Sequence, residues 1–232
     1  MVIESNFYYF KRMKKIDYYN QFADEFALAT LYVDMESIYQ PFLAELPNSA
    51  WILDLGCGSG RDTLAFKNKG YQVGAIDYSE VLVERATQLT GIAVQQQSFY
   101  ELDMHDVYDG VWACASLLHC ARNRLPNVLK RIHAALRRGG VCYMSFKYGT
   151  ADREKGGRAF TDLNEEQAQE LLDQLNGVRV LKQWITVDQR PDRQEKWLNI
   201  LWEKHALFYS YSSKKKIEIP KKYPTGSIVG EF

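Results

Sequence analysis

The sequence lacks the cysteine patterns and apolar runs that mark disulfide-rich, zinc-binding and membrane proteins. Its four cysteines form no CxxC pair, and each stands in or beside an apolar stretch, which is typical of small buried side chains in a reducing compartment. It has no apolar run of about 18 or more residues, and its first residues contain no long apolar stretch like that of a signal peptide. We therefore expect a cytoplasmic protein.

Net charge is also missing. The 232 residues include 29 Lys and Arg and 29 Asp and Glu, so no global charge attracts the protein to nucleic acid or anionic lipid. No cluster of His, Cys and Asp has the spacing of metal ligands, so we expect no metal. Hydrophobic residues make up 46% of the chain and charged residues 25%. This composition is typical of a globular protein with a substantial core.

Strand-like and helix-like segments alternate along most of the chain. This pattern predicts a parallel sheet covered on both faces. Two final strands separated only by a turn predict an antiparallel hairpin at one edge. The expected fold class is therefore α/β, a Rossmann-like doubly wound seven-stranded sheet, mostly parallel. The expected strands are residues 51–55, 72–77, 92–97, 110–114, 141–147, 178–187 and 197–203.

The sequence predicts three segments. Residues 1–46 contain two helical pieces and form an N-terminal helical lid, and residues 47–204 form the sheet domain. Residues 205–232 form a basic C-terminal extension in which lysines alternate with tyrosines. Such a mixture is found in exposed extensions or added strands, and it also occurs where a chain binds RNA through phosphates and stacked bases.

A glycine-rich loop in the stretch WILDLGCGSGRD joins the first strand to its helix. A dinucleotide fingerprint needs a third glycine at position 61, where the chain has Arg61, and a P-loop needs Gly-Lys-Ser/Thr, which is absent. Asp54 precedes the first glycine, where a carboxylate suits a cationic group better than a pyrophosphate. Asp77 ends the second strand, where an acid accepts hydrogen bonds from ribose hydroxyls. An ammonium and a ribose with no phosphate between them describe S-adenosylmethionine better than NAD.

These residues resemble a known family. DLGCGSGRD, the acid of IDYS and the seven-strand order are similar to class I S-adenosylmethionine-dependent methyltransferases. Further segments between residues 17 and 204 resemble the tellurite-resistance-like branch of small bacterial methyltransferases: DYYNQFADEF, VDMESIYQPFL, WACASLLHC, SFKYG, GRAFTDL, DQRP and WLNIL. The resemblance implies methyl transfer from S-adenosylmethionine to an acceptor, with S-adenosylhomocysteine as product.

The resemblance also implies which residues hold the cofactor. Asp54 and the glycine backbone would hold the methionine end, Asp77 the ribose, and Tyr78 would lie beside the adenine. Ser98 stands where the family commonly has an acid for the adenine amine, so a charged partner is lost and the affinity is lower. The complete expected set is Asp54, Gly56, Cys57, Gly58, Gly60, Asp77, Tyr78, Ser98, Phe99, Ala115 and Tyr19.

His119, just past the fourth strand, is the candidate catalytic base. Methyl transfer needs alignment of the reactants and exclusion of water. A thiolate or a reduced selenium or tellurium acceptor needs no base, whereas a hydroxyl or an amine benefits from one. The alternative is that His119 is a packed residue beside Leu117 and Leu118.

An acceptor pocket is expected near the same edge of the sheet. Three cations from separate loops would suit an anionic acceptor, although each is also compatible with a solvated surface charge. The resemblance implies a helical lid of Tyr18, Tyr19 and Phe22, which otherwise are core aromatics. The expected pocket residues are Tyr18, Lys147, Tyr148, Arg158 and Arg190.

Four functions remain open. The first is methylation of a small molecule, such as a thiol, a metalloid or an anionic metabolite. The second is methylation of RNA or protein guided by the basic extension; residues 115–118 lack the Asn/Asp-Pro-Pro-aromatic motif of base methylation. The third is a cofactor-binding module without turnover, which only Ser98 favours. The fourth, most distant, is an NAD-dependent dehydrogenase.

Overall fold

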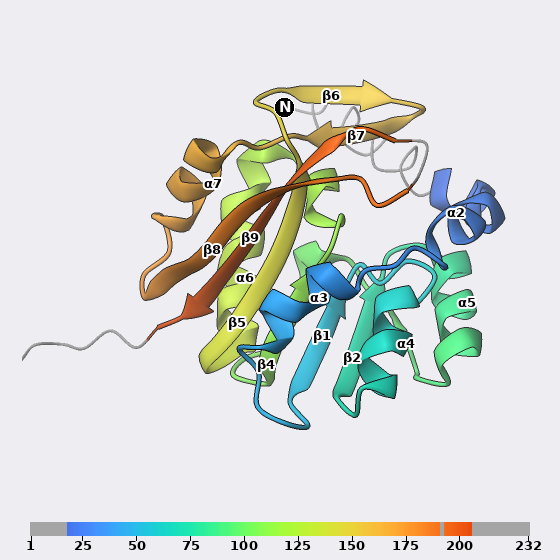
Figure 1. Cartoon of the computed structure of the whole chain (residues 1–232), viewed down its shortest axis with the longest axis horizontal. Helices are drawn as coiled ribbons and strands as arrows, with labels where there is room; N and C mark the ends of the chain where they lie inside the picture. The colour runs from blue at the N-terminus through green and yellow to red at the C-terminus, as the bar shows by residue number, and fades with distance from the viewer. Residues whose placement is uncertain (1–17, 191–192, 206–232) are drawn as a thin grey trace, which may run out of the picture.

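A seven-stranded sheet forms the centre of the molecule (Figure 1). The computed structural model describes residues 18–190 and 193–205, and its strand order is β3-β2-β1-β4-β5-β9-β8. The first five strands in this order are parallel, and β9 runs antiparallel to both β5 and β8. The strands are β1 (Trp51–Leu55), β2 (Gln72–Asp77), β3 (Gln95–Gln96), β4 (Tyr108–Ala113), β5 (Leu136–Lys147), β8 (Val178–Val187) and β9 (Lys196–Lys204). The predicted mostly parallel sheet with an antiparallel terminal hairpin is confirmed.

Helices cover both faces of this sheet. In Figure 1, α3 lies in front of the sheet and α6 behind it. Two helices begin with a side-chain cap, since Ser79 accepts a hydrogen bond from the Leu82 amide and Asn164 one from the Gln167 amide. Such caps satisfy free amides in the first turn of a helix. The helices are α2 (Ala23–Thr30), α3 (Glu36–Leu43), α4 (Arg61–Asn68), α5 (Glu80–Thr90), α6 (Leu125–Ala135) and α7 (Glu165–Leu172).

Trp112 of β4 is the centre of an aromatic cluster between the sheet and α3. Its ring stacks on Tyr143 with centroids 4.0 Å apart and contacts Phe42, Phe66 and Tyr39. All five side chains are buried, and buried aromatic rings contribute strongly to the hydrophobic stabilisation of a core. α3 is therefore part of the core, and of the predicted 1–46 lid the structure describes residues 18–46.

A small β-hairpin between β5 and α7 was not expected. It pairs β6 (Asp152–Lys155) with β7 (Arg158–Thr161) and lies above the end of the main sheet (Figure 1). Gly156 and Gly157 form its turn with φ of 59° and 74°, the left-handed conformations that a two-residue hairpin turn requires. The Gly-Gly pair was the available sequence signal. The third strand was predicted too long, because only Gln95 and Gln96 pair with β2.

The four cysteines are free, and three of them are buried. No helix in the described part of the chain is long and apolar enough to cross a membrane. The predicted basic extension, apart from His205, lies outside the described residues.

Candidate functional site

A cavity of about 1350 Å³ opens at the carboxyl ends of the parallel strands. It is lined by the glycine loop, the end of β2, the turn after β4, the helix of residues 18–30, the β6–β7 hairpin and the β8–β9 turn. Sites for a single small ligand usually measure about 300–1,000 Å³. The cavity is therefore large enough for two ligands side by side.

The glycine loop is shaped by contacts that leave no space for side chains. Gly56 has a φ of 82°, and a Cβ atom there would lie 2.5 Å from the Cβ of Ser116. Gly60 has a φ of 92°, and its Cβ would lie 3.1 Å from Ala86 of α5. Both positions therefore need glycine for conformation and for space.

The amides of this loop are already hydrogen-bonded within the protein. The amides of Gly56 and Cys57 both donate to the Ile76 carbonyl, at 2.9 Å and 3.0 Å. The amide of Gly58 donates to Asp77 at 2.9 Å. A pyrophosphate site instead needs amides that are free to bind the anion. This geometry opposes the dinucleotide alternative and agrees with the absence of a third fingerprint glycine.

Asp77 lines the cavity where a ribose is expected. Its two oxygens accept the amides of Gly58 and Ser79, both at 2.9 Å. Burial raises the pKa of Asp77, and these backbone hydrogen bonds oppose the rise. Each carboxylate oxygen can accept a further hydrogen bond. The residue therefore fits a ligand that presents two hydroxyl groups.

Asp54 lies behind the glycine loop, outside the set of residues that line the cavity. It is buried, and its Oδ2 accepts a hydrogen bond from the Thr63 hydroxyl at 2.6 Å. Burial, and then the nearby charge of Asp62, raise the pKa of Asp54. Its predicted direct contact with the cofactor stays a prediction, because the structure shows Asp54 supporting the first turn of α4.

Asp62 is a buried acid that sequence reasoning missed. Its carboxylate accepts hydrogen bonds from Tyr39 at 2.6 Å, from Trp112 at 2.7 Å and from Arg61 at 2.6 Å and 3.0 Å. Burial raises the pKa of Asp62, but the charge and hydrogen bonds of Arg61 lower it below its ordinary value. Arg61 also donates to the Thr30 carbonyl at the end of α2. The Arg61–Asp62 pair at the floor of the cavity is therefore connected to α2, to α3 and to the core.

The helix of residues 18–30 covers the glycine loop and is fixed to it. A Cβ at Gly58 would lie 3.0 Å from the ring of Phe26. The Ser79 hydroxyl donates to the Asn20 side chain at 2.6 Å. Tyr19 lines the cavity, whereas Tyr18 is outside its lining and Phe22 is exposed. The position of this helix fits the predicted lid.

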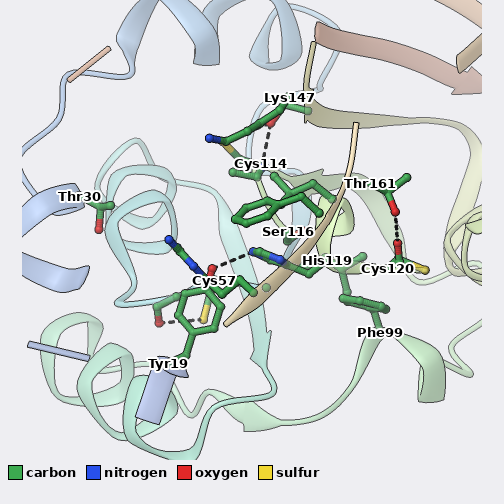
Figure 2. A pocket seen from close by; sticks show the side chains of 18 of the residues that line it. Tyr19, Thr30, Cys57, Phe99, Cys114, Ser116, His119, Cys120, Lys147 and Thr161 are labelled. Atoms are coloured by element: carbon green, nitrogen blue, oxygen red, sulfur yellow. Dashed lines mark hydrogen bonds between the residues drawn. The ribbon is translucent and has the colours of Figure 1, made fainter. Parts of the chain in front are cut away.

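His119 lies between the lid and the β6–β7 hairpin. Figure 2 shows Tyr19 and His119 pointing toward one another, and the Tyr19 hydroxyl is 2.7 Å from His119 Nε2. His119 Nδ1 is 2.9 Å from the Ala159 carbonyl of β7. Thr161 of the same strand donates to the Cys120 carbonyl at 2.8 Å. The hairpin therefore fixes the loop that carries the candidate base.

The residues expected around an adenine line the cavity as a group. Ser98 caps a short 3-10 helix, η1 (Phe99–Glu101), by accepting the Tyr100 amide at 3.2 Å. Position 98 carries a serine in place of an acid, and Gln97 beside it also lines the cavity. Ala115, after β4, has a φ of 52° and donates its amide to Ser145 at 2.8 Å. Such strained conformations recur at ligand sites.

The three predicted pocket cations differ in their partners. Lys147 donates to Glu195 at 2.6 Å, and Arg190 pairs with Asp188 at 2.5 Å. The expectation of three available charges needs correction, because these two carboxylates come from the β8–β9 turn and neutralise both cations. Arg158 has no carboxylate partner within the described part of the chain. Tyr148 is partly exposed and outside the cavity lining.

The comparisons with known proteins agree with this geometry. Residues 52–140 match the family described as "Methyltransferase domain". The 1,6-didemethyltoxoflavin-N1-methyltransferase of Burkholderia thailandensis, solved with 1,6-didemethyltoxoflavin and S-adenosylhomocysteine bound, is similar with a TM-score of 0.70. It is 25% identical over 84% of this chain and 87% of that chain. Residues 52–140 therefore match a methyltransferase domain, and the chain has the fold of S-adenosylmethionine-dependent methyltransferases. The predicted enzyme class and cofactor are confirmed at this level.

Two further matches are either lower in sequence identity or cover a smaller part of the chain. The magnesium protoporphyrin IX methyltransferase of Synechocystis PCC 6803, solved with S-adenosylmethionine, shares the fold with a TM-score of 0.65. It is 18% identical and covers 84% of this chain and 97% of its own. Hemagglutinin 1 of Eikenella corrodens is 29% identical over 43% of this chain and 35% of its own length. The chain spans 35% to 52% of the length of the curated relatives it matches.

Proposed function

We propose that the protein transfers a methyl group from S-adenosylmethionine to a small-molecule acceptor enclosed with it in the cavity. The observation that carries the proposal is that a single cavity of about 1350 Å³ joins Asp77 to His119. When bound, S-adenosylmethionine supplies the methyl group from its sulfonium. The proposal places the reaction in the cytoplasm, where the four cysteines stay reduced.

The residues of the cavity divide into two sets with separate roles. Asp77 accepts the hydroxyls of a ribose, and the glycine loop lets the ligand approach the backbone closely. Ser116 supports this fit, because it lines the cavity and its buried hydroxyl beside Gly56 has no hydrogen-bond partner in the described part of the chain. Such a group needs a partner, and the proposal assigns that partner to the ligand. At the other end, His119 accepts a proton from the nucleophile of the acceptor where that nucleophile is a hydroxyl or an amine.

Enclosure supports a small acceptor. The lid helix, through Tyr19, and the hairpin, through Ala159, both hydrogen-bond to His119 from opposite sides. The proposal takes these two contacts to restrict the access of water to the reacting groups and the access of a large polymer. Methylation of RNA or protein guided by the basic extension, residues 205–232, stays a prediction, because apart from His205 this segment lies outside the described residues. We propose a thiol, a metalloid or an anionic metabolite as the acceptor. The ground for this proposal is the resemblance to the tellurite-resistance-like branch, which comes from the sequence alone.

Calorimetric titration with S-adenosylhomocysteine tests the cofactor part. We expect binding to the wild type and about ten- to hundredfold weaker binding to Asp77→Asn, because hydrogen bonds to a charged group are among the stronger ones. Asp173→Asn is the matched control, since Asp173 is exposed at the end of α7 and outside the cavity lining. Absence of binding by the wild type would contradict the proposal. Formation of S-adenosylhomocysteine from S-adenosylmethionine with RNA but with no small molecule would contradict the choice of acceptor.

A further inference from the structure

Arg158 stands out among the cations of the cavity. Lys147, Arg153 and Arg190 also line it, and each has a carboxylate within 4.0 Å. Within residues 18–190 and 193–205, Arg158 has none, and its Nε is buried without a hydrogen-bond partner. A buried guanidinium N–H without a partner is costly. The Nε–H of Arg158 therefore needs a hydrogen-bond acceptor that the described part of the protein does not supply.

Aromatic rings hold this guanidinium in place. Its central carbon lies 4.1 Å from the ring centroid of Tyr18, 5.4 Å from that of Phe160 and 5.9 Å from that of Tyr19. Arginine stacks on rings through its flat face and keeps its N–H groups in the plane of the guanidinium. Stacking itself uses none of these donors. One side-chain hydrogen bond of Arg158 goes to Tyr19, and Nε stays without an acceptor, which a carboxylate of a ligand can supply.

Arg158 is also next to the candidate base. The following residue, Ala159, binds His119 Nδ1 through its carbonyl, and Tyr19 binds His119 Nε2. Arg124 is the other cavity arginine without a carboxylate in the described chain, but it stacks 3.6 Å from the ring centroid of Tyr100, in the segment expected around the adenine. An anion held by Arg158 would instead lie at the His119 end of the cavity.

We propose that Arg158 binds a carboxylate of the methyl acceptor, so that the substrate class is a small carboxylic acid whose nucleophile faces His119. This inference rests on the proposed function and narrows its acceptor. Charge pairing with a fixed, stacked guanidinium orients the acceptor, and orientation contributes much of the rate in a reaction between two bound reactants. Neutral acceptors of the same shape lack this anchor.

The test uses pairs of a carboxylate and its neutral amide on protein saturated with S-adenosylhomocysteine. Benzoate against benzamide and phenylacetate against phenylacetamide are titrated by calorimetry into wild type, Arg158→Gln, Arg158→Lys and Lys155→Gln. Lys155→Gln is the matched control, because it removes the same charge from the same hairpin at a side chain that is 71% exposed. Thermal unfolding of each variant checks that its fold is intact.

We expect at least one of the two carboxylates to bind the wild type about tenfold or more tightly than its amide. Arg158→Gln should abolish the preference, Arg158→Lys should keep part of it, and Lys155→Gln should keep all of it. Equal binding of acids and amides, binding of neither acid, or an unchanged preference in Arg158→Gln would overturn the inference. Failure of S-adenosylhomocysteine to bind would instead overturn the proposed function, so the two failures are distinguishable.

Discussion

The Tyr19 hydroxyl donates its hydrogen to Nε2 of His119 across 2.7 Å. The direction follows from the other ring nitrogen. Nδ1 lies 2.9 Å from the Ala159 carbonyl, which can only accept, so Nδ1 carries the proton and the neutral ring leaves Nε2 as an acceptor. The lid therefore covers the nitrogen that a general base would use.

The tautomer of His119 is the first prediction. Side-chain ¹⁵N–¹H correlation spectra above neutral pH should show His119 protonated at Nδ1 and unprotonated at Nε2. Tyr19→Phe should shift the Nε2 resonance, because it removes the donor, and should leave the Nδ1 proton in place. His133, which stacks on Trp202 outside the cavity, serves as the internal reference. Protonation at Nε2 in the wild type would show that the Ala159 contact does not set the tautomer.

Substitution of the base is the second prediction. With any acceptor that yields S-adenosylhomocysteine above background, His119→Asn should lower kcat about 10²- to 10⁴-fold if proton transfer limits the reaction. Cofactor affinity should stay at its wild-type value, since His119 lies at the acceptor end. His133→Asn is the matched control. Wild-type kcat in His119→Asn would make His119 a packed residue, the alternative that its sequence neighbours Leu117 and Leu118 leave open.

The contact between the glycine loop and the turn after β4 gives the third prediction. Gly70→Ala introduces strain alone, about 1–2 kcal/mol, because its φ is 90° and no atom lies near its Cβ position. Gly56→Ala should cost about 1–3 kcal/mol more, from the overlap with the Ser116 side chain. Ser116→Gly removes that side chain and should restore most of the extra loss in the double variant. Urea unfolding of the wild type, Gly56→Ala, Ser116→Gly and the double variant measures the coupling, with Gly70→Ala as the reference for strain alone. If the losses of unfolding free energy in the two single variants simply add in the double variant, the contact between positions 56 and 116 is contradicted.

The sheet and its ligand loop were predictable because their signals are local. Glycine spacing, an acid at a strand end and alternating apolar segments each act over a few residues, as Asp77 and Gly56 show. The partners of Lys147 and Arg190 were not predictable in this way. Glu195 comes 48 residues after Lys147 in the chain, and the two side chains meet only because β9 pairs with β5. The role of Asp62 likewise depends on Tyr39 and Trp112, which approach it only in the folded protein.

The fourth prediction concerns pH and Asp54. Burial raises its pKa from an ordinary value near 4 to about 8, so the folded state keeps a proton that the unfolded state loses between these values. Folding stability from this group is complete below the unfolded pKa and is lost as pH rises toward the folded pKa. Relative to Asp54→Asn, the wild type should lose about 1.4 kcal/mol per pH unit within that window and no more above it.

Urea unfolding at a series of pH values measures this difference. Asparagine has nearly the same shape and its side-chain oxygen can still accept the Thr63 hydroxyl, so the variant isolates the charge. Asp152→Asn controls for a general effect of removing a carboxylate, because Asp152 is exposed. A difference between wild type and Asp54→Asn that stays constant across the window would mean that Asp54 is ionised in the folded protein.

The fifth prediction is the cost of Asp62→Asn. All partners of this carboxylate are donors, from Tyr39, Trp112 and Arg61. An amide offers one acceptor oxygen and points two hydrogens at donors, which leaves the buried Arg61 charge unpaired. Removing one member of a buried ion pair costs about 3–5 kcal/mol. Urea unfolding should show a loss of this size, against less than about 1 kcal/mol for the exposed Asp152→Asn.

Tyr39→Phe keeps this prediction testable if Asp62→Asn does not fold. It removes one donor and keeps the ring that packs on Phe66 and Trp112, so the expected loss is about 1 kcal/mol. The same substitution removes one hydrogen bond that lowers the pKa of Asp62. Stability should therefore fall while the Arg61–Asp62 pair and binding of S-adenosylhomocysteine persist. Loss of cofactor binding in Tyr39→Phe would instead show that the cavity floor depends on this single hydroxyl.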